Sequence, residues 1–164
     1  MSELADMADA QRRAARISAR AEISDVRLLN AKVEIVRLPG LNAPLAYNLD
    51  LKPVVEYEEG SSSFVVRAAY QLLVAEQRPG ISDPFETNDT AIANIEFELA
   101  GLFMLHLDRK EDPPSPSELE AYAESTGQIA LYPFAREYIY DITGRMALPP
   151  LTIGVLKVRE ILVG

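Results

Sequence analysis

Four stretches of the chain alternate between apolar and polar residues with a period of two, which is typical of strands with one buried face. They span residues 22–38, 46–57, 63–75 and 90–107. The last stretch becomes apolar on both faces after Ala100, so we expect one end of the sheet to be covered twice. The pattern therefore predicts four strands before residue 108.

Two of these stretches contain irregularities. In the first, the apolar phase changes at Leu28 and Leu29, which predicts a bulge or strong coiling. In the second, Pro53 cannot donate a hydrogen bond to a neighbouring strand, so this strand belongs at a sheet edge or contains an irregularity. The connection 39–44 is too long for a two-residue hairpin, so we expect a crossover loop between the two strands.

Apolar residues at three- and four-residue steps predict helices at both ends of the chain. The N-terminal helix, residues 1–20, has a narrow seam made mostly of alanine, which buries little area. A short helix over 116–124 begins with capping-box spacing at Ser115 and Glu118. We expect Gly127 to lie near the end of this short helix.

The longest predicted helix spans residues 128–146 and is apolar on more than one face. One face is formed by Leu131, Phe134, Ala135, Tyr138, Ile139, Ile142 and Met146. The neighbouring face carries Tyr132, Arg136, Tyr140 and Thr143, whose polar tips suit a half-solvated contact. Pro149-Pro150 should end the helix because proline cannot donate the helical hydrogen bond. A core helix is one interpretation, and a contact with a second chain is the other.

Composition narrows the classes of function. The 164 residues suit one domain, and a net charge of −9 argues against general nucleic-acid binding. The absence of cysteine excludes disulfides and thiolate metal sites. No apolar run reaches membrane-spanning length, so we expect a soluble, cytoplasmic protein without direct membrane contact.

Candidate catalytic residues are few. His106, the single histidine, ends an apolar strand and lies outside any nucleophile motif, so we interpret it as structural. Glu96 and Glu98 share a strand face, but this spacing is common on solvated strands. The sequence therefore predicts no enzyme, and no requirement for ATP, a metal, a reducing agent or another cofactor.

One segment in the C-terminal third combines an aromatic, charged helix start with a later arginine and a proline pair. Its residues are Leu131, Pro133, Phe134, Ala135, Arg136, Glu137, Arg145, Pro149, Pro150 and Leu151. Together they resemble the signature of the SecB chaperone family. The chain looks most similar to SecB-like proteins of actinobacteria, including those encoded beside toxin–antitoxin pairs. That similarity extends over roughly residues 118–153.

The resemblance implies an α+β fold in which a four-stranded antiparallel sheet is followed by a long helix, here with an added N-terminal helix. It also implies a homotetramer built as a dimer of dimers, and we place the interface at Tyr132, Phe134, Arg136 and Tyr140. As a single domain the chain would comprise a helix (1–20), the sheet (21–108), a helical region (115–148) and a short tail (149–164).

The function implied by the resemblance is that of a holdase, which binds unfolded or extended polypeptides without ATP. The clients would be preproteins for export and translocation, an antitoxin of a toxin–antitoxin system, or both. Export members of the family continue into a second helix and a tail that contacts the export motor ATPase. Residues 151–164 are too few for both, so docking through a tail is not expected, and contact through the sheet surface stays open.

Client binding should use apolar surface beside irregular backbone, where a strand edge can also offer main-chain hydrogen bonds. The candidates are Val26, Leu28, Val36 and Leu38 in the first strand, Leu41, Leu45 and Tyr47 at the crossover loop, and Val55 and Tyr57 in the second strand. The alternative function is a small-molecule-binding protein or cofactor-free enzyme with a pocket between sheet and helix. That alternative requires convergent polar groups, which the sequence does not reveal.

Overall fold

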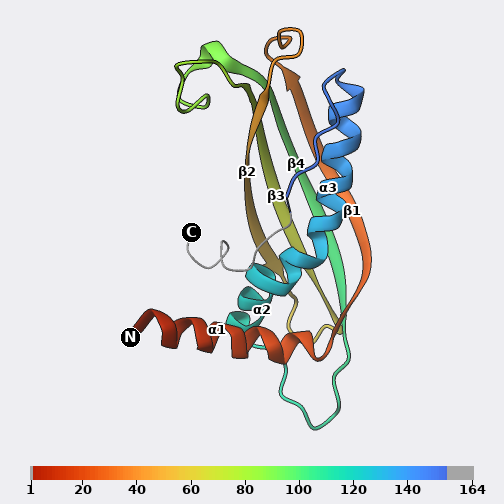
Figure 1. The fold of residues 1–164 in the computed structure, drawn as a ribbon. Helices are drawn as coiled ribbons and strands as arrows, with labels where there is room; N and C mark the ends of the chain where they lie inside the picture. Colours follow the sequence, from red (N-terminus) through yellow and green to blue (C-terminus); the bar gives the residue numbers. More distant parts are fainter. Residues whose placement is uncertain (1, 155–164) are drawn as a thin grey trace. The chain divides into compact units, whose positions relative to one another are not determined.

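The computed structural model describes residues 2–154 and shows four strands between one N-terminal helix and a C-terminal helical region (Figure 1). The elements are α1 (Ser2–Ser18), β1 (Ala21–Ile35), β2 (Leu45–Glu56), β3 (Ser63–Glu76), β4 (Ala91–Leu105), α2 (Pro116–Tyr122) and α3 (Gln128–Arg145). The strands form one antiparallel sheet in the order β1-β4-β3-β2. The predicted fold class is confirmed, whereas residues 155–164 of the predicted tail lie outside the described residues.

Strand order places β1 and β2 at the two edges of the sheet. The edge position predicted for the second strand from Pro53 is therefore correct. β1 ends at Ile35, earlier than expected, so Val36 and Leu38 belong to the crossover loop rather than to the strand. The loop then carries the chain from one sheet edge to the other.

The chain forms two compact units. The first comprises residues 1–27, 53–68 and 99–164, and the second comprises residues 28–52 and 69–98. Whether they act as the predicted single domain stays a prediction.

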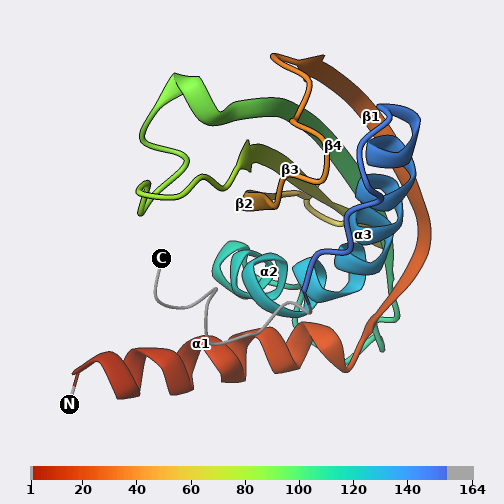
Figure 2. The same ribbon diagram turned by 45° about the horizontal axis from the view of Figure 1, so that its top comes forward.

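An aromatic cluster forms part of the core of the first unit. The rings of Phe64 and Phe103 stack with centroids 5.2 Å apart, and Tyr122 of α2 lies edge-on to both. Burial raises the pKa of Tyr122 to about 12. α1 lies beside α2 (Figure 2), where Arg16 pairs with Glu118 at 3.1 Å. This cluster joins strands β3 and β4 to the helical region within one unit.

The core of the second unit is formed by β3 and β4. Tyr70 and Phe97 stack with ring centroids 4.8 Å apart and an interplanar angle of 11°. The neighbouring buried side chains on these strands are Leu72, Val74, Ala93 and Ile95. Such offset aromatic pairs add about 0.5–1.5 kcal/mol to the stabilisation from burial alone.

The predicted capping box is present, but the predicted role of Gly127 is wrong. Ser115 accepts from the Glu118 amide, while Glu118 accepts from the Ser115 amide. Gly127 does not end the helix, because residues 123–127 form a π turn that leads directly into α3. A side chain at Gly127 would lie 3.3 Å from the Val66 side chain and 3.2 Å from the Tyr122 carbonyl. Glycine therefore suits close packing at this position and does not form a left-handed cap.

α3 ends before its two prolines. Ala147 has φ +58°, its amide donates to Gly144, and the Leu148 amide donates to Thr143 at 3.1 Å. This is a Schellman turn, which reverses the chain at a helix end and normally uses glycine at the left-handed position. The prolines follow the reversal and do not cause it.

The predicted apolar face of α3 is only partly correct. The buried stripe consists of Gln128, Leu131, Tyr132, Ala135, Ile139 and Thr143. Phe134, which was predicted on the apolar face, lies outside this stripe and is exposed. Thr143, predicted on the half-solvated face, is buried instead, and its hydroxyl donates to the Ile139 carbonyl at 2.7 Å.

Candidate client-binding surface

β1 is an edge strand that keeps its apolar side chains accessible. None of its 15 residues is buried. The large exposed apolar side chains on it are Ile23, Leu28, Leu29, Val33 and Ile35. A long edge strand with unpaired main-chain groups and apolar side chains normally pairs with another chain or is covered. β1 therefore has the properties of a binding strand.

Three apolar residues of β1 in the second unit, Leu29, Val33 and Ile35, share one face. Asn30 lines a polar depression together with Glu96 and Glu98, so these three side chains lie on the same side of the sheet. Because neighbouring residues in a strand point to opposite faces, Leu29 and Val33 lie on the other side, with Phe97. The exposed apolar band thus continues the buried face of β3 and β4 out to the sheet edge.

The crossover loop, residues 36–44, is fixed through its main chain. The Val36 amide donates to the Ile92 carbonyl at 2.8 Å, and the Gln77 amide donates to Pro44 at 2.8 Å. The Gly40 amide donates to the Glu76 carboxylate at 3.3 Å. These contacts hold the backbone while leaving apolar side chains free, and Leu41 is 95% exposed.

Glu76 is the main side-chain anchor of this loop. Besides the Gly40 amide, it accepts from Arg37 at 3.2 Å and from Arg78 at 3.4 Å. The Gly40 hydrogen bond lowers the pKa of Glu76, and the two guanidinium groups lower it further against the opposing effect of desolvation. The contacts of the loop therefore favour the ionised form of Glu76.

The nine predicted client-binding residues fall into two groups. Those in the second unit are Leu28, Val36, Leu38, Leu41, Leu45 and Tyr47. All of these are exposed except Leu45, which is half-buried. Those in the first unit, Val26, Val55 and Tyr57, are each half-buried. Their role in binding stays a prediction.

Sequence reasoning missed three exposed residues of the same surface, Leu29, Val33 and Ile35. Their alternation is that of an ordinary buried strand face, and alternation alone carries no sign of an edge. The phase change at Leu28 and Leu29 was the only local signal, and it indicated irregular backbone rather than exposure.

The four predicted interface residues of α3 behave in two ways. Phe134 and Tyr140 are exposed. Tyr132 is buried and its hydroxyl donates to the Gly154 carbonyl at 2.8 Å, while Arg136 Nε donates to the Ile153 carbonyl at 3.1 Å. Within the chain, Tyr132 and Arg136 thus hold the segment that follows α3, and their place between subunits stays a prediction.

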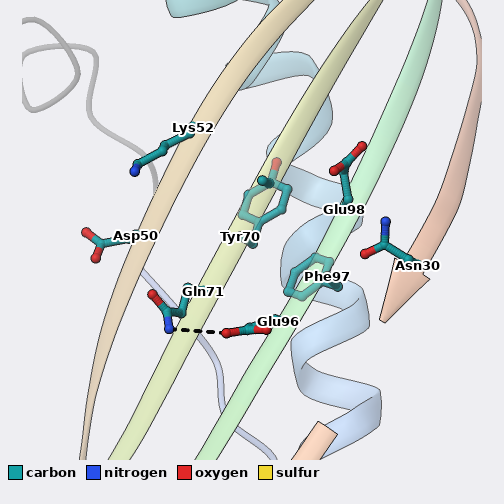
Figure 3. A pocket seen from close by; sticks show the side chains of 9 residues that line it. Asn30, Asp50, Lys52, Tyr70, Gln71, Glu96, Phe97 and Glu98 are labelled. Atoms are coloured by element: carbon teal, nitrogen blue, oxygen red, sulfur yellow. Dashed lines mark hydrogen bonds between the residues drawn. The ribbon is translucent and has the colours of Figure 1, made fainter. Parts of the chain in front are cut away.

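A shallow depression of about 300 Å³ in the second unit is a candidate small-molecule site (Figure 3). It is lined by Asn30, Asp50, Lys52, Ala69, Tyr70, Gln71, Glu96, Phe97 and Glu98. Gln71 donates to Glu96 at 3.4 Å. The other polar ends come from four different strands and do not converge on one point (Figure 3).

The single histidine and the acidic side chains of residues 2–154 form no cluster suited to a metal ion. His106 is exposed, and its Nε2 lies 3.4 Å from a carboxylate oxygen of Glu22. Among residues 2–154 no group of three or more histidine, aspartate or glutamate side chains is placed to hold a metal ion. No helix in that range is long and apolar enough to cross a membrane.

Comparison with known proteins identifies the family. No family model matches the chain. It is 44% identical over 159 residues to the SecB-like chaperone Rv1957 of Mycobacterium tuberculosis strain H37Rv, covering 93% of this chain and 87% of that protein. The SecB-like chaperone MT2006 of strain CDC 1551 is 43% identical with the same coverage.

A solved structure agrees with these sequences. Rv1957 in complex with a ChAD peptide from the Rv1956 HigA1 antitoxin superposes with a TM-score of 0.79 at 42% identity. The match covers 91% of this chain and 99% of that one. The chain belongs to the SecB-like chaperone family.

Proposed function

We propose that this protein is an ATP-independent chaperone that holds extended, unfolded segments of client polypeptides. The observation that carries this function is the exposed apolar band of β1 and the crossover loop, in a chain of the SecB-like family. Each apolar side chain that a client buries contributes on the order of 1.5–3 kcal/mol when burial is complete. Several such contacts suffice for capture without nucleotide.

Recognition combines two kinds of contact. The outer edge of β1 offers main-chain donors and acceptors to an added strand, which any sequence can use. Apolar side chains such as Leu29, Val33 and Leu41 offer contacts that favour unfolded chains, because folded clients bury the matching residues. This combination explains broad client acceptance with selectivity for the unfolded state.

The client we propose is an antitoxin segment. The support comes from the solved relative, which binds a ChAD peptide from the HigA1 antitoxin and shares 42% of its sequence with this chain. Preproteins destined for export are the second candidate, since a net charge of −9 attracts basic unfolded segments of any origin. We propose a cytoplasmic location, because both kinds of client would be captured there before they fold.

We further propose a homotetramer built as a dimer of dimers. One feature supports this assembly: the exposed rings of Phe134 and Tyr140 on α3. Leaving such surfaces in water promotes association. Light scattering at micromolar concentration gives the mass, and a monomer there would contradict the assembly.

The test of client binding adds charge to the crossover loop. The double variant Leu41→Asp, Tyr47→Asp should lose suppression of client aggregation, measured by light scattering without ATP after dilution of a denatured antitoxin. The matched control is Asn42→Asp, Asn48→Asp, which adds the same charge beside each site. Asn42 has φ +57°, a conformation that aspartate also tolerates.

The control should suppress aggregation like the wild type, and both variants should keep the wild-type mass. Wild-type activity in both double variants would show that the crossover loop is not the client site. Loss of activity in both would indicate a general effect of charge.

A further inference from the structure

The chain segment after α3 is bound like a peptide ligand. After the Schellman turn it runs back alongside the helix (Figures 1 and 2). The Leu151 amide donates to Thr143 Oγ1 at 2.9 Å, and the Ile153 and Gly154 carbonyls accept from Arg136 and Tyr132. We call residues 151–154 the returning segment.

Side-chain burial in the returning segment alternates as in an extended peptide. Ile153 is only 1% exposed, whereas Thr152 and Gly154 on either side of it are exposed. Leu151 is half-buried. One branched aliphatic side chain is therefore enclosed, and its neighbours face water.

α3 recognises the main chain of this segment rather than its side chains. Tyr132 and Arg136 donate to backbone carbonyls of the segment, and Thr143 accepts from its backbone amide. Such contacts do not depend on which residues follow the turn. Any extended segment with a branched aliphatic residue at the buried position presents the same carbonyls and amide.

We propose that this face of α3 is a second peptide-binding site, occupied by the chain's own residues 151–154 until an extended client segment displaces them. The inference rests on the proposed holdase function and adds a site to it. The ligand class is an extended apolar peptide with valine, isoleucine or leucine at the position of Ile153.

The returning segment competes strongly because it is tethered. Only residues 146–150 separate it from α3, and short tethers give effective concentrations on the order of millimolar. A free peptide must therefore exceed that concentration, or bind more tightly, before it takes the site. Weak or folded partners are excluded in this way, while long unfolded clients anchored elsewhere on the chaperone gain access.

The test measures binding of a fluorescent peptide with the sequence of residues 148–154, LPPLTIG, by anisotropy. Ile153→Asp should expel the returning segment and open the site, so this variant should bind the peptide at least tenfold more tightly than the wild type. Thr152→Asp, which adds the same charge at an exposed position, should bind like the wild type. Adding Tyr132→Phe to Ile153→Asp removes one carbonyl donor and should weaken the peptide about fivefold.

Two results would overturn the proposal. Ile153→Asp that is folded by circular dichroism yet binds the peptide no better than the wild type would show that the face accepts only its own segment. Peptide binding unaffected by Tyr132→Phe would place the peptide elsewhere. If Ile153→Asp does not fold, Ile153→Ser replaces it in the same comparison.

Hydrogen–deuterium exchange of the wild type supplies a test without substitutions. A saturating denatured client should accelerate exchange of the Leu151 amide, which Thr143 protects in the free protein, and unchanged exchange would contradict displacement. The aggregation assay separates the two proposals. If the protein suppresses client aggregation but Ile153→Asp does not bind the peptide, only the second site is refuted. If the protein does not suppress client aggregation, the holdase function is refuted.

Discussion

Strands β1 and β4 are neighbours in the sheet and each has 15 residues, yet they differ in burial. β4 has a buried residue at nearly every second position, whereas β1 has none. Both sequences alternate apolar and polar residues. Alternation therefore identifies which side chains share a face, and strand order decides whether that face is core or is left for another chain.

The largest difference should appear when one apolar side chain is removed from each strand. Phe97→Ala in β4 should lower the free energy of unfolding by about 3–5 kcal/mol, because it leaves a cavity beside Tyr70. Leu29→Ala in β1 should cost about 1 kcal/mol or less, since Leu29 is 46% exposed. Urea denaturation measures both, and equal losses would refute the division into core and binding strands.

Close packing in β4 can also be tested by adding a methyl group. A Cβ at Gly101 would lie 2.8 Å from Leu131 Cδ2 and 2.9 Å from Phe103 Cε2, both in buried side chains. Gly101→Ala should therefore destabilise the protein by about 1–3 kcal/mol. The control is Gly144→Ala in α3, where the nearest atom is 3.6 Å away, and it should cost nothing. Thermal denaturation compares them, and a harmless Gly101→Ala would contradict the packing.

A smaller stability effect with a large binding effect is expected at Val33. Val33→Lys places a charge on the apolar face of β1, a substitution that sheet edges tolerate. The free energy of unfolding should fall by about 1 kcal/mol or less, while client affinity falls about tenfold. Asn30→Lys adds the same charge on the opposite face and should leave client binding intact. Similar affinities for the two variants would exclude this face of β1 from the client site.

The smallest expected effect is the response of the crossover loop to a fall in pH. The lowered pKa of Glu76 means that its carboxylate stabilises the loop fully above the usual glutamate value of about 4.3, and this stabilisation is lost as the pH falls through the lowered pKa. Protection of the Gly40 amide, followed by NMR exchange, should therefore decrease on acidification in the wild type. Glu76→Gln should be less protected at neutral pH and show little further change. A pH-independent wild type would contradict the anchoring role.

Local signals in the sequence predicted much of the fold. The capping box at Ser115 and the edge position of Pro53 are set by residues close in sequence, and both are confirmed. The exposure of Leu29, Val33 and Ile35 was not predictable, because the order of strands depends on distant pairings. The left-handed turn at Ala147 gave no signal either, since alanine is rare in that conformation.

The candidate site was harder to predict than the fold. Tyr132 and Arg136 have the amphipathic character of interface residues, and that character was recognised. The same character suits contact with the chain's own backbone, which is what the structure shows within the chain. Residue type indicates a half-solvated partner but not whether that partner is another subunit or a later part of the same chain.

The π turn at residues 123–127 sets the direction in which the side chains of α3 point. Each residue of an α-helix rotates the chain by about 100°, so the extra residue of a π turn changes the direction in which every later side chain points. If this turn were one residue shorter, the residues that follow it would be unchanged, but their side chains would point toward different neighbours. In this chain the length of the segment between Ser115 and Leu131 therefore decides which neighbours the residues Pro-Phe-Ala-Arg-Glu that follow it meet.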